Sequence, residues 1–173
     1  MVRQARAEIT RDTVLAGAAH VFLRLGYANA SLSEIISQSQ VTKGALYFHF
    51  GSMEELARAV IDEGSTRLSA AWTSIDDGRI PALEATIGIS YATVDLAVGD
   101  PMVAAMFRLK HQIGDYRGTD GNVVDSWGTS YLNLAQRAIA EGDVNSDADS
   151  ATVGTLFLEM IIGAHMVAVA TDS

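Results

Sequence analysis

Apolar and polar residues along the first 75 positions follow helical spacing, interrupted by residues that cap helices. Apolar side chains recur three and four residues apart on one face of the first predicted helix: Val14, Leu15, Ala18, Ala19, Phe22 and Leu25. Gly26 is a suitable stop for this helix. Ser31-Leu-Ser-Glu34 and Ser52-Met-Glu-Glu55 both have the form of a capping box, so helices are predicted to begin there. Thr42 caps another short helix through Phe50, and the helix from Ser52 extends to about Ile75.

The remainder of the chain also predicts helices. Pro81 and Pro101 each stand where a first helical turn begins, and Asp100 caps the second of these helices. A loop containing Gly114, Gly118 and Gly121 follows. The predicted helices cover 81–98, 101–113, 123–141 and about 147–170, with Asp147 as the cap of the last. Strand patterns and hairpin turns are missing from the sequence, so the predicted fold is all-α with eight helices.

The last predicted helix contains a long apolar stretch, Val153–Thr171, which has two interpretations. A membrane span is one, but Glu159 and His165 lie inside the stretch and no Lys or Arg flanks it. The other is a helix buried in a bundle or a dimer seam, where small residues permit close contact. We therefore expect no membrane association, and we expect His165 to be a buried, hydrogen-bonded side chain.

Composition narrows the class of protein. The chain has 173 residues, 49% of them hydrophobic, and no cysteine, which excludes disulfides, thiolate metal sites and cysteine nucleophiles. The N-terminus has no apolar run of the kind found in signal peptides, which favours a cytoplasmic location. Asp143–Asp147 imitates a calcium loop but lacks its glycine and its bidentate glutamate. Phosphate-binding and zinc-protease motifs are also missing, so we expect no catalytic residues, no cofactor and no metal.

Charge is distributed unevenly along the chain. The formal net charge is -9, which by itself argues against a DNA-binding protein. Residues 1–60, however, carry a balance of +1, whereas the remaining 113 residues carry -10. This asymmetry indicates two functions in one chain, and an acidic solvated surface on one part is the alternative interpretation.

The short helix after Thr42 has the chemistry of a DNA-reading helix. Thr42 presents a hydroxyl and a helix N-terminus suited to phosphate, and Lys43 reaches a phosphate or a guanine edge. Gly44 lets the backbone approach the duplex, while Tyr47 and His49 offer polar tips. We expect a buried apolar set in the same helix: Leu46, Phe48 and Phe50. An ordinary amphipathic helix is the alternative interpretation.

These residues resemble a known family. The run VTKGALYFHF, preceded by VFLRLGYANASLSEI, is similar to the recognition-helix region of the TetR family of one-component transcriptional repressors. The N-terminal RQARAEITRDTVL and the surroundings of Trp127 resemble the γ-butyrolactone receptors within that family. The DNA-binding motif covers about a third of the chain, and the other helices match in number, length and order.

The resemblance implies a repressor that binds pseudo-palindromic double-stranded operator DNA as a homodimer and is released by a small apolar effector. It implies a helix-turn-helix DNA-binding domain at 1–51 and a helical ligand-binding and dimerisation domain at 52–173. Arg3 and Arg6 would form a flexible arm, and Ser31 and Ser33 would contact the DNA backbone. The implied recognition-helix contacts are Thr42, Lys43, Gly44, Tyr47 and His49.

The implied ligand pocket is centred on Trp127. The side chains expected to join it are Tyr91, Met106, Phe107, Tyr131, Phe157 and Met160. Aromatic and methionine residues at helical spacing are also typical core residues, and this alternative stays open for each of them.

Two departures from the family pattern matter. Met53 stands where family members usually carry a lysine, which removes one implied phosphate contact per subunit. Family members also continue beyond the position of Ser173 into a further helix of the dimer interface. Both departures leave a second hypothesis open, namely a small-molecule-binding helical dimer without DNA-binding activity.

Overall fold

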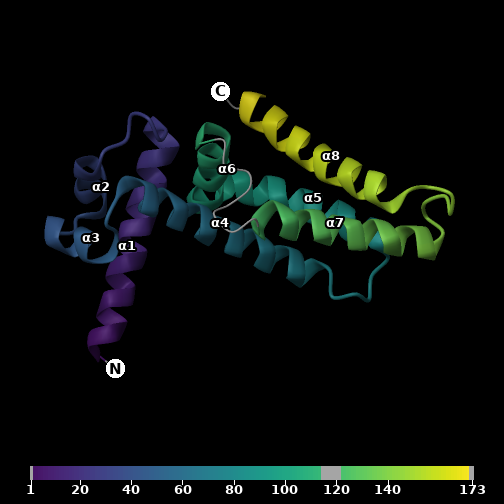
Figure 1. The fold of residues 1–173 in the computed structure, drawn as a ribbon, viewed down its shortest axis with the longest axis horizontal. Helices are drawn as coiled ribbons and strands as arrows, with labels where there is room; N and C mark the ends of the chain where they lie inside the picture. Colours follow the sequence, from purple (N-terminus) through teal and green to yellow (C-terminus); the bar gives the residue numbers. More distant parts are fainter. Residues whose placement is uncertain (1, 114–121, 172–173) are drawn as a thin grey trace. The chain divides into compact units, whose positions relative to one another are not determined.

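The computed structural model describes residues 2–113 and 122–171, and the side chains of 6–113 and 127–167 within them. The described residues form eight α-helices and contain no strand (Figure 1). In chain order the helices are α1 Val2–Leu25, α2 Leu32–Ser39, α3 Lys43–His49, α4 Met53–Ile75, α5 Ala82–Gly99, α6 Pro101–Ile113, α7 Asn122–Glu141 and α8 Ser150–Thr171. The all-α prediction is confirmed. The predicted glycine loop after α6 lies outside the described residues.

The predicted capping residues begin the short helices. The Ser31 hydroxyl accepts a hydrogen bond from the Glu34 amide at 3.3 Å and donates one to the Glu34 carboxylate at 2.9 Å. Thr42 caps α3 by accepting from the Ala45 amide at 3.2 Å. Ser52 accepts from the Glu55 amide at 3.1 Å, directly before α4. These local bonds satisfy backbone donors that would otherwise be free at each helix start.

Two of the predicted chain features are wrong. The segment expected to be a flexible arm is part of a helix, since α1 begins at Val2. The physical reason is that its Arg, Gln, Ala and Glu residues are good helix formers. The last helix begins at Ser150 rather than near Asp147. Its cap is Asp149, whose carboxylate accepts from the Thr152 amide at 2.9 Å, while the Asp147 amide donates to Asn145 in the preceding turn.

The chain divides into two compact units. The first comprises Met1–Thr66 with Gly99–Gly114, and the second comprises Arg67–Val98 with Asp115–Ser173. The division falls inside α4 and places α6 with the first three helices. The functional boundary that we predict between residues 51 and 52 stays a prediction.

In the first unit, α1 packs against α2, α3 and α6. A Cβ added at Gly17 in α1 would lie 2.7 Å from the Ser39 Cβ, so α1 and α2 cross closely at this glycine. Arg108 of α6 donates to the carbonyl of Leu23 at 2.6 Å, and Gln112 accepts from the Tyr27 amide at 2.8 Å. Two polar side chains of α6 therefore hold the C-terminal end of α1.

The same unit contains a close approach of α4 and α6. A Cβ at Gly64 would lie 2.6 Å from the Met106 Cβ and 2.9 Å from the carbonyl oxygen of Met102. Next to it, the Ser65 hydroxyl lies 3.2 Å from the Met106 sulfur and 3.4 Å from the Lys110 Nζ. Lys110 is almost fully buried, and desolvation lowers its pKa to about 8, with the Asp62 carboxylate opposing the shift.

In the second unit, α7 and α8 lie side by side in Figure 1, joined by a short loop. A Cβ at Gly154 would meet the backbone of Leu132 at 3.0 Å, so this glycine permits the contact. The other side of α8 is apolar and exposed, with Leu156, Met160 and Val167 on one face. In the described part of the chain, the stretch Ser150–Val167 of α8 is the one segment long and apolar enough to cross a membrane, judged by length and composition alone.

Candidate nucleic-acid interface and ligand cavity

Helix α3 has one buried and one exposed half. Leu46 is fully buried, and Ala45 and His49 are half-buried beside it. The opposite half exposes Lys43, Gly44 and Tyr47, with the Lys43 Nζ 5.8 Å from the centre of the Tyr47 ring. A Cβ at Gly44 would meet no atom within 4 Å, so the space above this residue is open. The exposed half therefore offers a cation, a phenol and a gap to a partner.

The assignment of one aromatic residue on α3 requires a correction. Phe48, predicted as core, is 78% exposed, whereas Phe50 is buried as expected. Phe48 is one turn beyond Gly44 and therefore shares its exposed face, while His49 points closer to the core. The His49 ring lies between its neighbours, 5.0 Å from the Phe48 ring in an edge-to-face contact and 6.4 Å from the Phe50 ring.

The other predicted DNA contacts lie outside α3. Ser31 and Ser33 are exposed at the start of α2, and the Ser31 hydroxyl is engaged by Glu34. Arg6 is exposed on the first turns of α1. The backbone of Arg3 belongs to α1, and its side chain lies outside the described side chains. That these residues and Thr42 at the α3 cap contact DNA stays a prediction.

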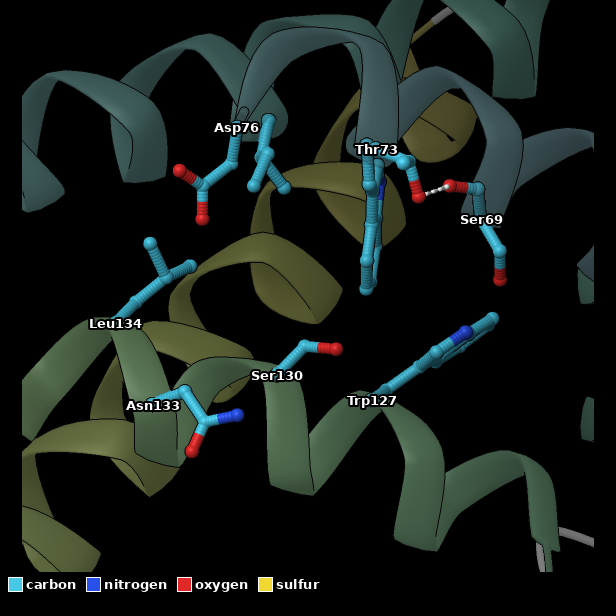
Figure 2. Close-up of a pocket in the computed structure, with 9 residues that line it drawn as sticks. Ser69, Thr73, Asp76, Trp127, Ser130, Asn133 and Leu134 are labelled. Carbon is cyan, nitrogen blue, oxygen red and sulfur yellow. Dashed lines mark hydrogen bonds between the residues drawn. The ribbon is translucent and has the colours of Figure 1, made fainter. Parts of the chain in front are cut away.

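A cavity of about 270 Å³ lies in the second unit, among α4, α5 and α7 (Figure 2). Its lining residues are Ser69, Trp72, Thr73, Asp76, Ile89, Trp127, Ser130, Asn133 and Leu134. In Figure 2 the side chains of Trp127 and Ser130 on α7 point toward α4. The Thr73 hydroxyl is held by the Ser69 carbonyl at 2.9 Å. The lining combines an aromatic wall with hydroxyl and amide groups, a composition typical of small-molecule sites.

The aromatic wall is a cluster of three rings. The Trp72 ring lies 5.5 Å from Trp127 and 5.4 Å from Tyr131, the latter in an edge-to-face arrangement. The Trp72 indole donates to the Thr93 hydroxyl at 2.9 Å, which fixes its orientation. The Tyr131 hydroxyl is fully buried with no hydrogen-bond partner among the described residues, and desolvation raises its pKa.

The charged group of the cavity is already paired. Arg137 donates to both carboxylate oxygens of Asp76, at 2.7 and 2.8 Å, and to the Ile80 carbonyl at 2.7 Å. This hydrogen bond to the Asp76 carboxylate raises the pKa of Arg137. Glu141 lies 3.7 Å from the same guanidinium and accepts from the Ala82 amide at 2.6 Å. Arg137 therefore neutralises the Asp76 carboxylate at the cavity.

Trp127 is the one predicted lining residue that lines this cavity; it is 6% exposed. Tyr131 belongs to the aromatic cluster through its contact with Trp72 but does not line the cavity. Phe157 on α8 is half-buried. Tyr91 and Met160 are 71% and 64% exposed on α5 and α8. The two remaining predicted residues belong to the first unit: Met106, which is buried against Ser65, and Phe107, which is half-buried.

Sequence reasoning missed the α4 side of the cavity. Ser69, Trp72, Thr73 and Asp76 recur at i, i+3, i+4 and i+7 and therefore share one helical face. Polar residues at helical spacing around one of only two tryptophans are a signal that the sequence does carry. Among the described residues, no three His, Asp or Glu side chains are grouped to hold a metal ion.

The exposed α3 face and the separate cavity are features of a helix-turn-helix regulator with a sensor region, and comparisons with known proteins agree. The model of the TetR family of bacterial regulatory proteins matches residues 14–60. Over 63 residues the chain is 51% identical to the A-factor receptor protein of Streptomyces griseus, spanning 36% of this chain and 23% of that protein. The HTH-type transcriptional repressor BepR of Brucella suis biovar 1 is 26% identical, with 92% of this chain and 80% of BepR covered.

Solved structures extend the similarity over almost the whole chain. A γ-butyrolactone receptor described as ArpA-like is 32% identical, with 94% of this chain and 85% of the receptor covered and a TM-score of 0.79. The TetR family protein CprB from S. coelicolor A3(2) is 31% identical, with 94% and 79% covered and a TM-score of 0.80. The chain therefore belongs to the TetR family. It is a DNA-binding transcriptional regulator and not an enzyme, and the comparisons give no support to the alternative without DNA binding.

Proposed function

We propose that this chain is a ligand-responsive repressor, which a neutral small molecule of γ-butyrolactone type releases from its operator. The observation that carries the proposal is that α4 belongs in part to each of the two units. Residues 53–66 of this helix belong to the unit that contains α3, and its next turns supply Ser69, Trp72 and Thr73 to the cavity. A ligand that displaces these cavity residues acts on the same continuous helix that follows the recognition helix.

The chemistry of the cavity supports a neutral effector of modest size. The Asp76 carboxylate is occupied by Arg137, so a cationic ligand finds no free counter-ion there. The Asn133 amide at the cavity offers a hydrogen bond to a carbonyl or ether oxygen, and the tryptophan rings cover an apolar chain. A lactone ring with an alkyl substituent combines these features, and γ-butyrolactone receptors are among the relatives.

The apolar face of α8 supports a homodimer. Leu156, Met160 and Val167 are each more than half exposed in the single chain, and Gly163 lies on the same face. A face of this kind is unstable in water unless a partner covers it, and a second copy is the partner that TetR regulators use. Two-fold symmetry then requires a pseudo-palindromic operator. We place the regulator in the cytoplasm, where its operator is accessible. Light scattering at micromolar concentration should give the mass of two chains; a stable monomer would contradict the arrangement.

A mobility-shift assay with the DNA upstream of the protein's own gene tests the proposal. The wild-type protein should shift this DNA, and γ-decalactone should reverse the shift, whereas the ring-opened 4-hydroxydecanoate should not. Ligand and DNA must oppose each other with a coupling of about 1–3 kcal/mol, because a ligand that binds both states equally shifts neither.

Trp127→Ala should still shift the operator but should no longer respond to the lactone. Tyr91→Ala serves as the control, since Tyr91 is an exposed aromatic residue outside the cavity. A folded Trp127→Ala protein that the lactone still releases from the operator as it releases the wild type would remove the ligand site from this cavity.

A further inference from the structure

Phe48 is the most exposed large apolar side chain in the described part of the molecule, and neither the fold nor the proposed pocket uses it. Single exposed apolar residues are common on protein surfaces and need no explanation by themselves. Phe48 differs because it lies on the recognition helix, on the same exposed half as Lys43, Gly44 and Tyr47. Its phenyl ring is therefore continuous with the proposed DNA-binding surface.

The ring is also held in position. The half-buried His49 ring meets Phe48 edge-to-face, with centroids 5.0 Å apart and ring planes at 86°. His49 is in turn 6.4 Å from Phe50, which is buried in the core of the first unit. A side chain supported from the core loses less rotamer freedom when it meets a partner than an unsupported one.

Gly44 leaves room for a close approach beside this ring. It precedes Phe48 by one helical turn on the same face, and nothing lies within 4 Å of the position that its Cβ would take. A helix in the major groove approaches base edges along such a face. In that position the phenyl ring of Phe48 would face the floor of the groove, where it could contact an apolar group of a base.

The major groove presents one apolar group in unmodified DNA. The edges of adenine, guanine and cytosine show donors and acceptors there, whereas thymine adds a C5-methyl group. A phenyl ring cannot hydrogen-bond to base edges, so its favourable partner in the groove is the thymine methyl. We propose that Phe48 is a specificity-determining residue that reads thymine methyl groups in the operator; this inference rests on the proposed function as a DNA-binding repressor.

Deoxyuridine tests the contact directly, because it lacks only the methyl group of thymidine. An operator duplex is first selected from random-sequence DNA by the wild-type protein, and each thymine in one half-site is then replaced by deoxyuridine. The wild-type protein should lose about fourfold in affinity for each contacted methyl, the value expected for one buried carbon. Replacement at the remaining thymines should leave the affinity unchanged.

Three variants assign the effect to the phenyl ring. Phe48→Ala should bind the thymine operator more weakly and should be insensitive to deoxyuridine at the positions that the wild type reads. Phe48→Leu keeps an apolar side chain and should retain part of the sensitivity. Ile87→Ala, an exposed apolar control on α5, should behave as the wild type. All three should unfold at the wild-type temperature, since each side chain is exposed.

The possible outcomes separate the two proposals. If the wild-type protein selects a DNA sequence but binds every deoxyuridine duplex as tightly as the thymine duplex, the methyl contact is excluded while the repressor function stands. Equal weakening of Phe48→Ala on both duplexes would also exclude it and would assign the ring to the sugar-phosphate backbone. If the wild type selects no DNA, the proposed function fails, and the inference fails with it.

Discussion

The exposed half of α3 and the cavity wall on α4 and α7 differ in how far the folded chain buries them. Phe48 is 78% exposed and Gly44 has open space above it, so this half of α3 contributes little to the core. Trp72 and Trp127 are each 6% exposed and pack against one another. The side chains proposed to bind DNA on α3 are therefore separate from those that stabilise the fold, whereas the side chains of the proposed ligand site also hold the second unit together.

The largest expected effect is at the cavity wall. Trp72→Ala removes a buried ring that contacts Trp127 and Tyr131 and donates to Thr93. The free energy of unfolding should fall by about 3–5 kcal/mol, measured by urea denaturation. Phe48→Ala is the matched aromatic truncation on α3 and should change it by less than about 0.5 kcal/mol. Similar losses of unfolding free energy in the two variants would contradict the expected difference between the cavity wall and the exposed half of α3.

A second prediction concerns the buried lysine of the first unit. Burial lowers the pKa of Lys110 to about 8 from its ordinary 10.5. Between these values the unfolded chain binds more protons than the folded chain, so the free energy of unfolding should rise with pH. The rise should be about 2–3 kcal/mol from pH 7 to pH 10. Above pH 10 the raised pKa of Tyr131 acts in the opposite sense, because the unfolded chain then loses its phenolic proton first.

Lys110→Met should flatten this dependence and should unfold less easily than the wild type at pH 7, because the cost of burying an ammonium disappears. Lys43→Met is the matched control, since Lys43 is exposed on α3 and should leave the slope as it is in the wild type. An equal slope in Lys110→Met and the wild type would contradict the assignment to Lys110.

Alanine substitutions at two glycines test the difference between a packed and an open helix surface. Gly64→Ala forces a Cβ against Met106 and the Met102 carbonyl, so the first unit should lose about 1–3 kcal/mol. Gly44→Ala meets no atom and should gain about 0.5–1 kcal/mol from the better helix former, while its operator binding weakens. Thermal unfolding and mobility shift on the same two variants measure both quantities. A Gly44→Ala protein with unchanged operator affinity would show that α3 does not approach DNA along this face.

The smallest effect on stability is expected for Lys43. Lys43→Ala should change the free energy of unfolding by less than about 0.5 kcal/mol, because the side chain is exposed. Its loss should nevertheless weaken operator binding and, if Lys43 meets a phosphate, lower the slope of log affinity against log salt by about one. A salt titration by fluorescence anisotropy measures the slope. An unchanged affinity and slope would remove Lys43 from the interface.

The two regions also differ in how well the sequence predicts them. The starts of α2, α3 and α4 depend on capping bonds between residues three positions apart, so Ser31, Thr42 and Ser52 could be identified directly. The cavity brings α4 and α7 together across more than fifty residues, and no local pattern states which faces meet. The resemblance predicts Trp127, whereas the contact of Trp72 with Trp127 follows only from the tertiary packing.

Errors within predictable elements have local physical causes. Phe48 is predicted in the core together with Leu46 and Phe50, but on a helix residue 48 lies on the face opposite Leu46. Asp147 and Asp149 are both good capping residues two positions apart. The choice between them depends on the turn in which the Asp147 amide donates to Asn145, and this turn follows no pattern in the flanking helices.

The pairing of Asp76 with Arg137 has a consequence for how such a sensor diversifies. The charge at the cavity is set by a residue that does not line it, since Arg137 neutralises Asp76, the one charged residue of the lining. A single substitution at position 137 would release a carboxylate into the cavity and turn a site for neutral molecules into one that favours amines. New effector classes are thus reachable in one mutational step outside the helix proposed to read the operator.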